Sequence, residues 1–368
     1  MARALNLARR GLGNVEPNPM VGAVIVRHGK IVGKGYHQRF GHAHAEVNAL
    51  RDAGPAARGA TLYVTLEPCC HWGKTPPCTD AILAAGVTRV VIAMVDPFAS
   101  VRGKGIALLR KRGIQVDLGL LESSARALNA PFITNVSLGR PFVIAKWAQS
   151  IDGCVALASG ESQWISSETS RAFVQTLRGR MDAIIVGRGT ALADDPLLMS
   201  RPNSGSDIRR IATRIVLDSD CRLPPNSQLV RTIPFAPLMV VHARNLGRAA
   251  EKRRIVLAER GVMTVPIPID NTGRPRIHSL LKFLGKRDYT NILVEGGPEL
   301  MASFLAQNLV DEAHIFIAPI VIGGKKSRHA VGGEDLPKLA DAVRLQFTAA
   351  TRSGPDIHIV ARREHTIR

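Results

Sequence analysis

The chain has 368 residues, 45% of them hydrophobic, and is therefore long enough for two domains with separate cores. It contains no run of eighteen apolar residues and no apolar signal-peptide core, so we expect a cytoplasmic protein. A formal net charge of +19 points to nucleic acid, but only 4% of the residues are aromatic and the basic residues are dispersed. We therefore expect no base-stacking surface and no nucleic-acid partner, and the charge suits phosphorylated metabolites better.

Strand-like and helix-like patterns alternate through the first 120 residues. Helical spacing predicts helices at 2–10, 45–53, 79–85 and 104–112. Short apolar runs predict strands at 21–26, 31–36, 61–65, 89–94 and 115–118. This alternation indicates an α/β domain in which a mixed or parallel sheet lies between helices.

Potential metal ligands gather after two of these strands. His44 precedes a predicted helix, and four further candidates follow the third strand, namely Cys69, Cys70, His71 and Cys78. Adjacent residues rarely reach one ion together, so we assign Cys69 and Cys78. With His44 they give three ligands for a tetrahedral Zn²⁺ whose fourth position is left for water.

Glu46 gives this site a catalytic interpretation. Zinc would lower the pKa of a bound water towards about 7, and a carboxylate two residues after the ligating His44 could move protons beside it. His-x-Glu followed by Pro-Cys and a further Cys is the signature of zinc-dependent nucleoside and base deaminases. A structural zinc knot or buried free thiols are the alternative, but neither would use Glu46 at this spacing.

The five cysteines favour the same interpretation. Three of them fall within ten residues, which is typical of a metal site and a poor framework for disulfides. His37 and His42 precede the motif in a predicted loop, where we expect them to be solvated, and we leave both outside the ligand set.

Three segments carry a family resemblance: Glu16 to Val24, His42 to Glu46, and Pro68 to Cys78. Together they resemble the deaminase half of the bifunctional riboflavin-biosynthesis family, which joins a pyrimidine deaminase to a pyrimidine reductase. The resemblance implies a cytidine-deaminase-like, three-layer N-terminal domain. The eight residues between Cys69 and Cys78, too many for deaminases at large, are the family's own version of the motif.

The resemblance also implies that Asn18, between two prolines, contacts the substrate, although an ordinary Asx turn would use the same residue. Two departures from the family pattern are visible. Lys74 stands where an Arg is usual, and the loop that begins at Asp96-Pro97 continues with Phe98-Ala99-Ser100 instead of an Asn-Pro-Lys-like run.

Turn formers from Thr134 to Pro141 mark a domain boundary, and we place a deaminase domain at 1–138 and a reductase domain at 139–368. The strand that starts at Phe142 and runs into the turn Asp152-Gly153 resembles the opening strand of dihydrofolate-reductase-like folds. It is similar to the reductase half of the same family, which implies a dihydrofolate-reductase-like C-terminal domain that uses NADPH.

A glycine turn in this half could approach a cofactor. Strand 291–295 is followed by Gly296-Gly297 and a helix at 299–307, so backbone N–H groups could contact a pyrophosphate. A bare strand-to-helix corner would have the same sequence. Because no Gly-x-Gly-x-x-Gly opens a βαβ unit, we do not predict a Rossmann domain.

Residue by residue, the resemblance implies two further sets. The substrate set is Lys146, Ser162, Arg178, Leu198, Arg201 and Glu295. The NADPH set is Ala148, Trp164, Thr190, Asp194, Ser219, Gly297, Pro298, Glu299, Leu300, Met301, Ala302 and Ser303. Arg178 and Arg201 could hold a phosphate through bidentate bonds, and Lys146 or Glu295 could orient the sugar. Trp164 could instead be core, and Asp194 could cap a turn.

The rest of the second half carries weaker patterns. We expect surface loops or peripheral helices at 200–212 and 241–260, strands at 313–317 and 356–361, and a frayed tail at 365–368.

The resemblance in both halves implies a bifunctional enzyme of riboflavin biosynthesis. The resemblance implies deamination of 2,5-diamino-6-(5-phosphoribosylamino)pyrimidin-4-one, then NADPH-dependent reduction to 5-amino-6-(5-phosphoribitylamino)uracil, in a homo-oligomer. Two other classes stay open. A nucleic-acid or tRNA deaminase would leave the second half without a role, and a silent scaffolding protein would leave Glu46 without one.

Overall fold

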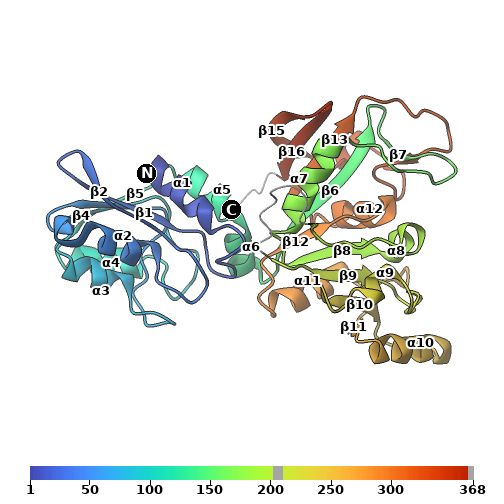
Figure 1. Ribbon diagram of the computed structural model, residues 1–368, viewed down its shortest axis with the longest axis horizontal. Helices are drawn as coiled ribbons and strands as arrows, with labels where there is room; N and C mark the ends of the chain where they lie inside the picture. Colours follow the sequence, from blue (N-terminus) through green and yellow to red (C-terminus); the bar gives the residue numbers. More distant parts are fainter. Residues whose placement is uncertain (202–209, 364–368) are drawn as a thin grey trace. The chain divides into compact units, whose positions relative to one another are not determined.

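The computed structural model describes residues 1–201 and 210–363. The chain forms two compact units, Met1–Arg140 and Pro141–Arg368, coloured from blue to teal and from green to red in Figure 1. This division lies two residues after the predicted boundary at 138/139. The first of the turn formers, Thr134 to Leu138, are part of the helix α6 (Ala130–Leu138). That helix ends at Gly139, whose φ of 63° is in the left-handed region that glycine adopts without strain.

The first unit is built on a five-stranded sheet in the order β2-β1-β3-β4-β5. β1 is antiparallel to both its neighbours, whereas β3, β4 and β5 are parallel. The strands are β1 (Gly22–Arg27), β2 (Lys30–Tyr36), β3 (Thr61–Val64), β4 (Arg89–Ile92) and β5 (Gln115–Leu118). The predicted mixed sheet is confirmed.

Helices cover both faces of this sheet (Figure 1). One face carries α2 (Ala45–Ala53), α3 (Cys78–Ala84) and α4 (Lys104–Lys111), and the other carries α1 (Ala2–Ala8) and α5 (Glu122–Leu128). The arrangement is the three-layer fold that the sequence predicted.

α2 lies unusually close to the sheet, and small residues explain why. Its inward face consists of Ala45, Ala49 and Ala53, spaced four apart. Opposite them, β2 has Gly33 and Gly35, where any Cβ atom would collide with the α2 backbone. Because His44 and Glu46 are at the start of α2, this close approach fixes both against the sheet.

The second unit contains a nine-stranded sheet in the order β11-β10-β9-β8-β12-β6-β13-β16-β15. In this order, every pair of neighbouring strands from β11 across to β13 is parallel. β16 is antiparallel to β13, and the edge strand β15 is antiparallel to β16. The strands are β6 (Phe142–Ser150), β8 (Ala183–Gly187), β9 (Thr213–Leu217), β10 (Leu238–Ala243), β11 (Met263–Ile267), β12 (Asn291–Val294), β13 (Glu312–Ala318), β15 (Leu345–Ser353) and β16 (Asp356–Arg363). A short ribbon pairs β7 (Cys154–Ala156) with β14 (Arg328–His329).

α11 (Ile277–Gly285) and α12 (Pro298–Ala306) contribute to the core on one face of this sheet. α7 (Glu168–Arg178) packs on β13 and β16 through Phe173, whose ring centroid lies 4.7 Å from that of His358. α7 begins where Ser167 accepts the Ser170 N–H and donates its own N–H to Asp356. The remaining helices are α8 (Arg188–Asp194), α9 (Gln228–Arg231) and α10 (Arg248–Glu259).

One expectation for this unit is wrong. Residues 241–243 were expected in a surface segment, but they form the end of β10, a strand whose residues are all buried. The expectation of a helix or loop holds for α10, which follows. Part of the segment at 200–212 and all of the tail at 365–368 lie outside the described residues.

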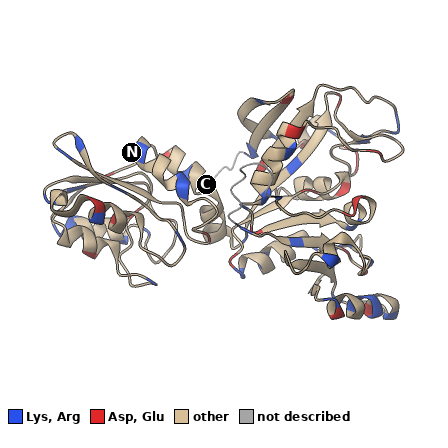
Figure 2. Ribbon diagram, in the orientation of Figure 1, with Lys and Arg blue, Asp and Glu red and all other residues tan. Residues whose placement is uncertain are grey.

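Basic residues are spread over helices and strands in both units, as Figure 2 shows. They do not form one continuous stripe on the described ribbon. Among the helices of the described residues, none is long and apolar enough to cross a membrane.

Candidate active sites

The predicted metal ligands come together in the first unit. His44 caps the start of α2, Cys69 follows β3, and Cys78 is the first residue of α3. His44 Nδ1 lies 3.2 Å from Cys78 Sγ and 3.6 Å from Cys69 Sγ, and the three potential ligand atoms all lie within 4.8 Å of one another. One imidazole and two thiols at these separations fit a tetrahedral zinc ion.

A hydrogen bond couples the protonation of the two thiols. A hydrogen bond from Cys78 lowers the pKa of Cys69 to about 4, and the same contact raises the pKa of Cys78 well above its usual value. Of the two, Cys69 is the thiol that loses its proton more readily, and it is the thiolate that ligates metal. His44 presents Nδ1 to the sulfurs, while its Nε2 lies 3.5 Å from the Thr75 hydroxyl.

Glu46 lies in the first turn of α2 and is 3% exposed. Burial and, to a smaller extent, the nearby Cys69 raise the pKa of its carboxyl to about 7, against the pull of His44. A carboxyl group with a pKa near neutrality can both accept and donate a proton at little cost. The group is therefore poised for proton transfer beside the three ligands.

The structure corrects the prediction for His37, which is 2% exposed instead of solvated. Its Nδ1 lies 3.2 Å from the Ala43 carbonyl oxygen, which can only accept, so Nδ1 carries the proton. Its Nε2 must then accept from the Asn18 amide nitrogen at 3.1 Å. This contact turns the Asn18 amide so that its oxygen is left as the acceptor for another group.

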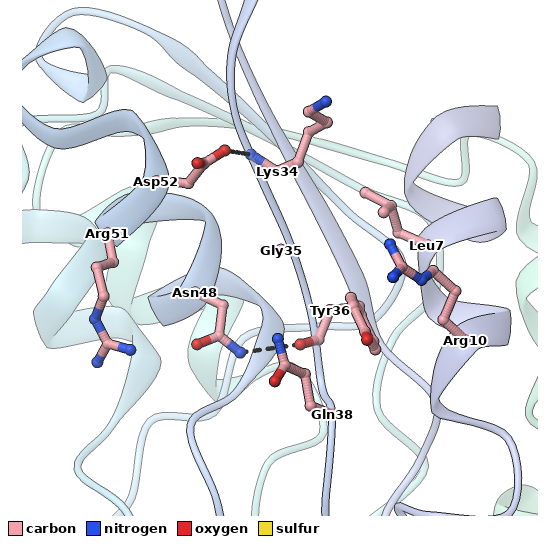
Figure 3. A pocket seen from close by; sticks show the side chains of 9 residues that line it. All are labelled: Leu7, Arg10, Lys34, Gly35, Tyr36, Gln38, Asn48, Arg51 and Asp52. Atoms are coloured by element: carbon pink, nitrogen blue, oxygen red, sulfur yellow. Dashed lines mark hydrogen bonds between the residues drawn. The ribbon is translucent and has the colours of Figure 1, made fainter.

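A separate hollow in this unit, of about 450 Å³, lies beside β2, between α1 and α2 (Figure 3). Two of its polar side chains bond to the backbone of β2: Asp52 accepts the Lys34 N–H at 2.8 Å, and Asn48 donates to the Tyr36 carbonyl at 2.9 Å. The metal ligands and Glu46 do not line it. This hollow is therefore separate from the candidate metal site at His44 and the two cysteines.

In the second unit, three charged groups from separate elements lie close enough to interact. Lys146 is on β6, Arg178 ends α7, and Glu295 follows β12. Arg178 donates from Nε and Nη2 to the two oxygens of Glu295, at 2.6 and 2.7 Å. The side chains of this pair are only 15% and 7% exposed.

Electrostatics link Lys146 to this pair. Burial lowers the pKa of Lys146, and Glu295 partly opposes the effect. Burial also acts to raise the pKa of Glu295, but Arg178 and Lys146 outweigh it, so that the pKa is lowered and the carboxylate stays charged. Sequence reasoning placed these residues near one substrate but did not detect that Arg178 binds Glu295, because the two lie 117 positions apart.

Two members of the expected NADPH set are in contact. The Thr190 hydroxyl accepts the Gly297 N–H at 3.0 Å, which joins α8 to the start of α12. Gly296 has no room for a side chain, because a Cβ atom there would strike Leu300. Gly297, Pro298 and Glu299 open α12, and Ser303 bonds back to the Glu299 carbonyl within the helix.

Other expected residues are more scattered. Trp164 is 68% exposed, so it is not a core residue. The Arg171 guanidinium carbon lies over the Trp164 ring, 4.7 Å from its centroid. Leu198 is buried with φ of 50°, and the Arg201 N–H is bonded to Gln175 of α7. Ala148 is half-buried on β6, Asp194 ends α8 exposed, and Ser162 and Ser219 are half-buried in loops.

Comparison with known proteins identifies both units. Residues 1–94 match the family model described as "Cytidine and deoxycytidylate deaminase zinc-binding region", and residues 141–359 match "RibD C-terminal domain". The fold and the ligand cluster thus define a zinc-type deaminase joined to a reductase. The chain belongs to the RibD family, the bifunctional deaminase-reductases of riboflavin biosynthesis.

The relatives match along almost their whole length. The riboflavin biosynthesis protein RibD of Escherichia coli is 43% identical and that of Aquifex aeolicus is 39% identical, with at least 97% of every chain covered. A solved Acinetobacter baumannii RibD has 37% identity and a TM-score of 0.85, covering 98% of this chain and 97% of that chain. A deaminase/reductase of Thermotoga maritima has 33% identity and a TM-score of 0.83, covering 99% and 97%.

These matches confirm the predicted family, fold class and bifunctional activity. They do not favour the nucleic-acid or tRNA deaminase, because the similarity to RibD continues through the second unit. A silent scaffolding role is likewise not favoured for a member of this enzyme family.

Proposed function

We propose that the first unit hydrolytically deaminates 2,5-diamino-6-(5-phosphoribosylamino)pyrimidin-4-one with Zn²⁺ held by His44, Cys69 and Cys78. The second unit then uses NADPH to give 5-amino-6-(5-phosphoribitylamino)uracil. The observation that carries the first half of the proposal is the cluster of His44 Nδ1 and two sulfurs beside the buried Glu46. The Thermotoga maritima relative is described as a diaminohydroxyphosphoribosylaminopyrimidine deaminase and 5-amino-6-(5-phosphoribosylamino)uracil reductase, the same pair of activities.

In deamination, water adds to the amino-bearing ring carbon and ammonia leaves. Zinc would supply the activated water, whose pKa it lowers towards about 7. Glu46 accepts a proton from the attacking water and returns one to the departing amino group. Its pKa of about 7 matches both steps.

Asn18 and His37 would contact the substrate beside this site, since the His37 ring centroid lies 5.4 Å from that of His44. Since His37 accepts the Asn18 amide N–H, the Asn18 oxygen is the group presented to the substrate. It would accept a hydrogen bond from an N–H or amino group of the pyrimidine. Burial lowers the pKa of His37, which keeps the ring neutral and the Asn18 amide in this orientation.

In the reductase half, NADPH would supply the hydride that reduces the opened ribose. Lys146 and Glu295 orient the sugar, and Lys146 is a proton source at its lowered pKa. Arg178 is already bound to Glu295 through two N–H groups, so we assign to it the orientation of that carboxylate. Arg201 then remains as the principal phosphate contact, with Ser162 and Leu198 beside the substrate.

We assign NADPH contacts to Ala148, Trp164, Thr190, Asp194 and Ser219, and to the start of α12 from Gly297 to Ser303. The contact between Thr190 and Gly297 supports this assignment, because it holds the α12 N-terminus at the end of β8. Backbone N–H groups at a helix N-terminus suit a pyrophosphate.

The test is mass spectrometry of products formed from the diaminopyrimidine phosphoribosyl substrate. Zinc-loaded protein without NADPH is expected to give the deaminated product alone, and with NADPH the deaminated and reduced product. After zinc removal by a chelator, deamination should fall at least 100-fold, while reduction of added deaminated intermediate continues. Unchanged substrate under every condition with zinc-loaded protein would contradict the proposal.

The oligomeric state forms a separate proposal, a homo-oligomer assembled through the reductase unit. β15 is an edge strand that is exposed over most of its length, and its Phe347 is 69% exposed. Exposed edges of this kind pair readily with another chain. Light scattering should give at least twice the chain mass of 39.7 kDa, and Phe347→Lys should reduce it. A wild-type mass of one chain at micromolar concentration would rule the oligomer out.

The cysteines support a cytoplasmic location. All five are free in the structure, three of them buried, as expected of a protein that works in a reducing compartment.

A further inference from the structure

A buried carboxylate two residues before Cys69 gathers four backbone N–H groups. Glu67 is 3% exposed and follows β3. Its Oε2 accepts from Asp96 at 3.2 Å and Gly103 at 2.9 Å, and its Oε1 accepts from Gly105 at 3.0 Å and Ile106 at 3.2 Å. All four donors belong to one segment, the loop after β4 and the first turn of α4.

Four N–H donors shared between two oxygens fill the acceptor positions of a carboxylate. Charge-assisted bonds of this kind are stronger than neutral ones, and a negative charge at the start of α4 is favoured by the helix dipole. The backbone of Glu67 adds a fifth bond, from its N–H to the Met94 carbonyl at 3.0 Å. Glu67 therefore ties residues 94–106 to the segment that carries Cys69.

The two segments also touch directly. A Cβ atom at Gly105 would collide with the Pro68 carbonyl oxygen, so α4 begins against the residue that precedes Cys69. The ring of His71, in the stretch between the two cysteines, lies 6.4 Å from that of Phe98 in the loop. The loop at 96–103 and the start of α4 thus lie against the segment from Pro68 to His71, which includes Cys69.

We propose that Glu67 is a positioning residue for deamination, which sets the distance between the Cys69 turn and the loop at 96–103. The inference rests on the proposed function of the first unit. Glu67 acts through other residues, because both of its carboxylate oxygens accept hydrogen bonds from backbone N–H groups. Its loss is expected to weaken both the hold on zinc and the binding of the pyrimidine.

The test compares Glu67→Gln with Glu122→Gln in the full chain. Gln has nearly the same shape, but its amide nitrogen would face two N–H donors that now meet an oxygen. Glu122 is also an acidic residue in the first turn of a helix of this unit, but its side chain is 50% exposed and pairs with Arg126 at 3.7 Å. It is the matched control.

For Glu67→Gln, chelator competition should show zinc affinity about 10- to 100-fold weaker, the range found when groups behind metal ligands are removed. KM for the pyrimidine should rise more than kcat falls. Amide hydrogen exchange at Asp96, Gly103, Gly105 and Ile106 should accelerate. Glu122→Gln should match the wild type in each measurement, and both variants should reduce added deaminated intermediate normally.

Wild-type zinc affinity and KM in Glu67→Gln would overturn the proposal. If that variant does not fold, Glu67→Asp keeps the charge but shortens the side chain by one methylene, and it should show the same changes to a smaller degree. An unchanged Glu67→Asp would then count against the proposal. Zinc affinity and hydrogen exchange need no substrate, so they judge Glu67 even if the wild type does not deaminate the pyrimidine.

Discussion

Glu46→Gln is expected to retain zinc and to lose deamination by a factor of at least about 100, the range for loss of a general acid-base group. The variant should fold, because a carboxyl whose pKa is raised to about 7 by burial is already partly neutral in that position. Gln fills the same space without a proton to exchange. Steady-state deamination and metal content, measured on the same preparation, check both halves of the result.

Two comparisons make the Glu46 result specific. Asp52→Asn, at an exposed position on the same helix, should deaminate like the wild type. Reduction of added deaminated intermediate should be unchanged in Glu46→Gln, because that reaction belongs to the other unit. Deamination retained in a zinc-loaded Glu46→Gln would remove Glu46 from the mechanism.

Glu295→Leu is expected to abolish reduction and to destabilise the second unit by about 3–5 kcal/mol, the usual effect of removing one partner of a buried ion pair. Arg178 would lose both of its bonds to Glu295, and Lys146 would lose the carboxylate that favours its charged form. Denaturant unfolding measures the loss of stability, and NADPH oxidation with the deaminated intermediate measures reduction. Deamination should persist.

Removing both partners is the informative comparison. In Arg178→Met combined with Glu295→Leu, no unpaired charge of the pair remains, so part of the stability should return while reduction stays absent. Glu251→Gln breaks a more exposed pair, Arg254 with Glu251, and should change stability far less than Glu295→Leu does. The ion pair would contribute little if the stability loss of the double variant equalled the sum of the losses of the two single variants. The same conclusion would follow if Glu295→Leu were as stable as the wild type.

Local patterns were enough to predict the fold of the first unit. α2 has the predicted bounds, and the strands are within one or two residues of the predicted ranges, because each element is an uninterrupted apolar or alternating run. The choice of Cys69 and Cys78 agrees with the observed cluster, and the placement of the two residues explains why. One lies after a strand and the other opens a helix, so both reach the same end of the sheet.

Contacts between distant residues could not be predicted in this way. The burial of His37 depends on Asn18 and on the Ala43 carbonyl, and neither bond has a signature in the local sequence. No strand was predicted at 213–217, where the structure has β9, because Arg214 interrupts its apolar run. That guanidinium is fully buried, with bonds to Thr232 and the Ala236 carbonyl, an environment that composition cannot reveal.

The strand order of the second sheet has a consequence for synthesis of the chain. β6 is the first strand of that unit to be synthesised, yet its neighbours in the sheet are β12 and β13. Phe142 pairs with Asn291, and Ile144 pairs with Glu312, so neither pairing can form until those later residues have been synthesised. Pairings this distant in sequence form slowly. On the ribosome the deaminase unit can therefore be complete while the reductase unit still lacks both flanks of its central strand, and translation that stops before β13 would yield the first activity without the second.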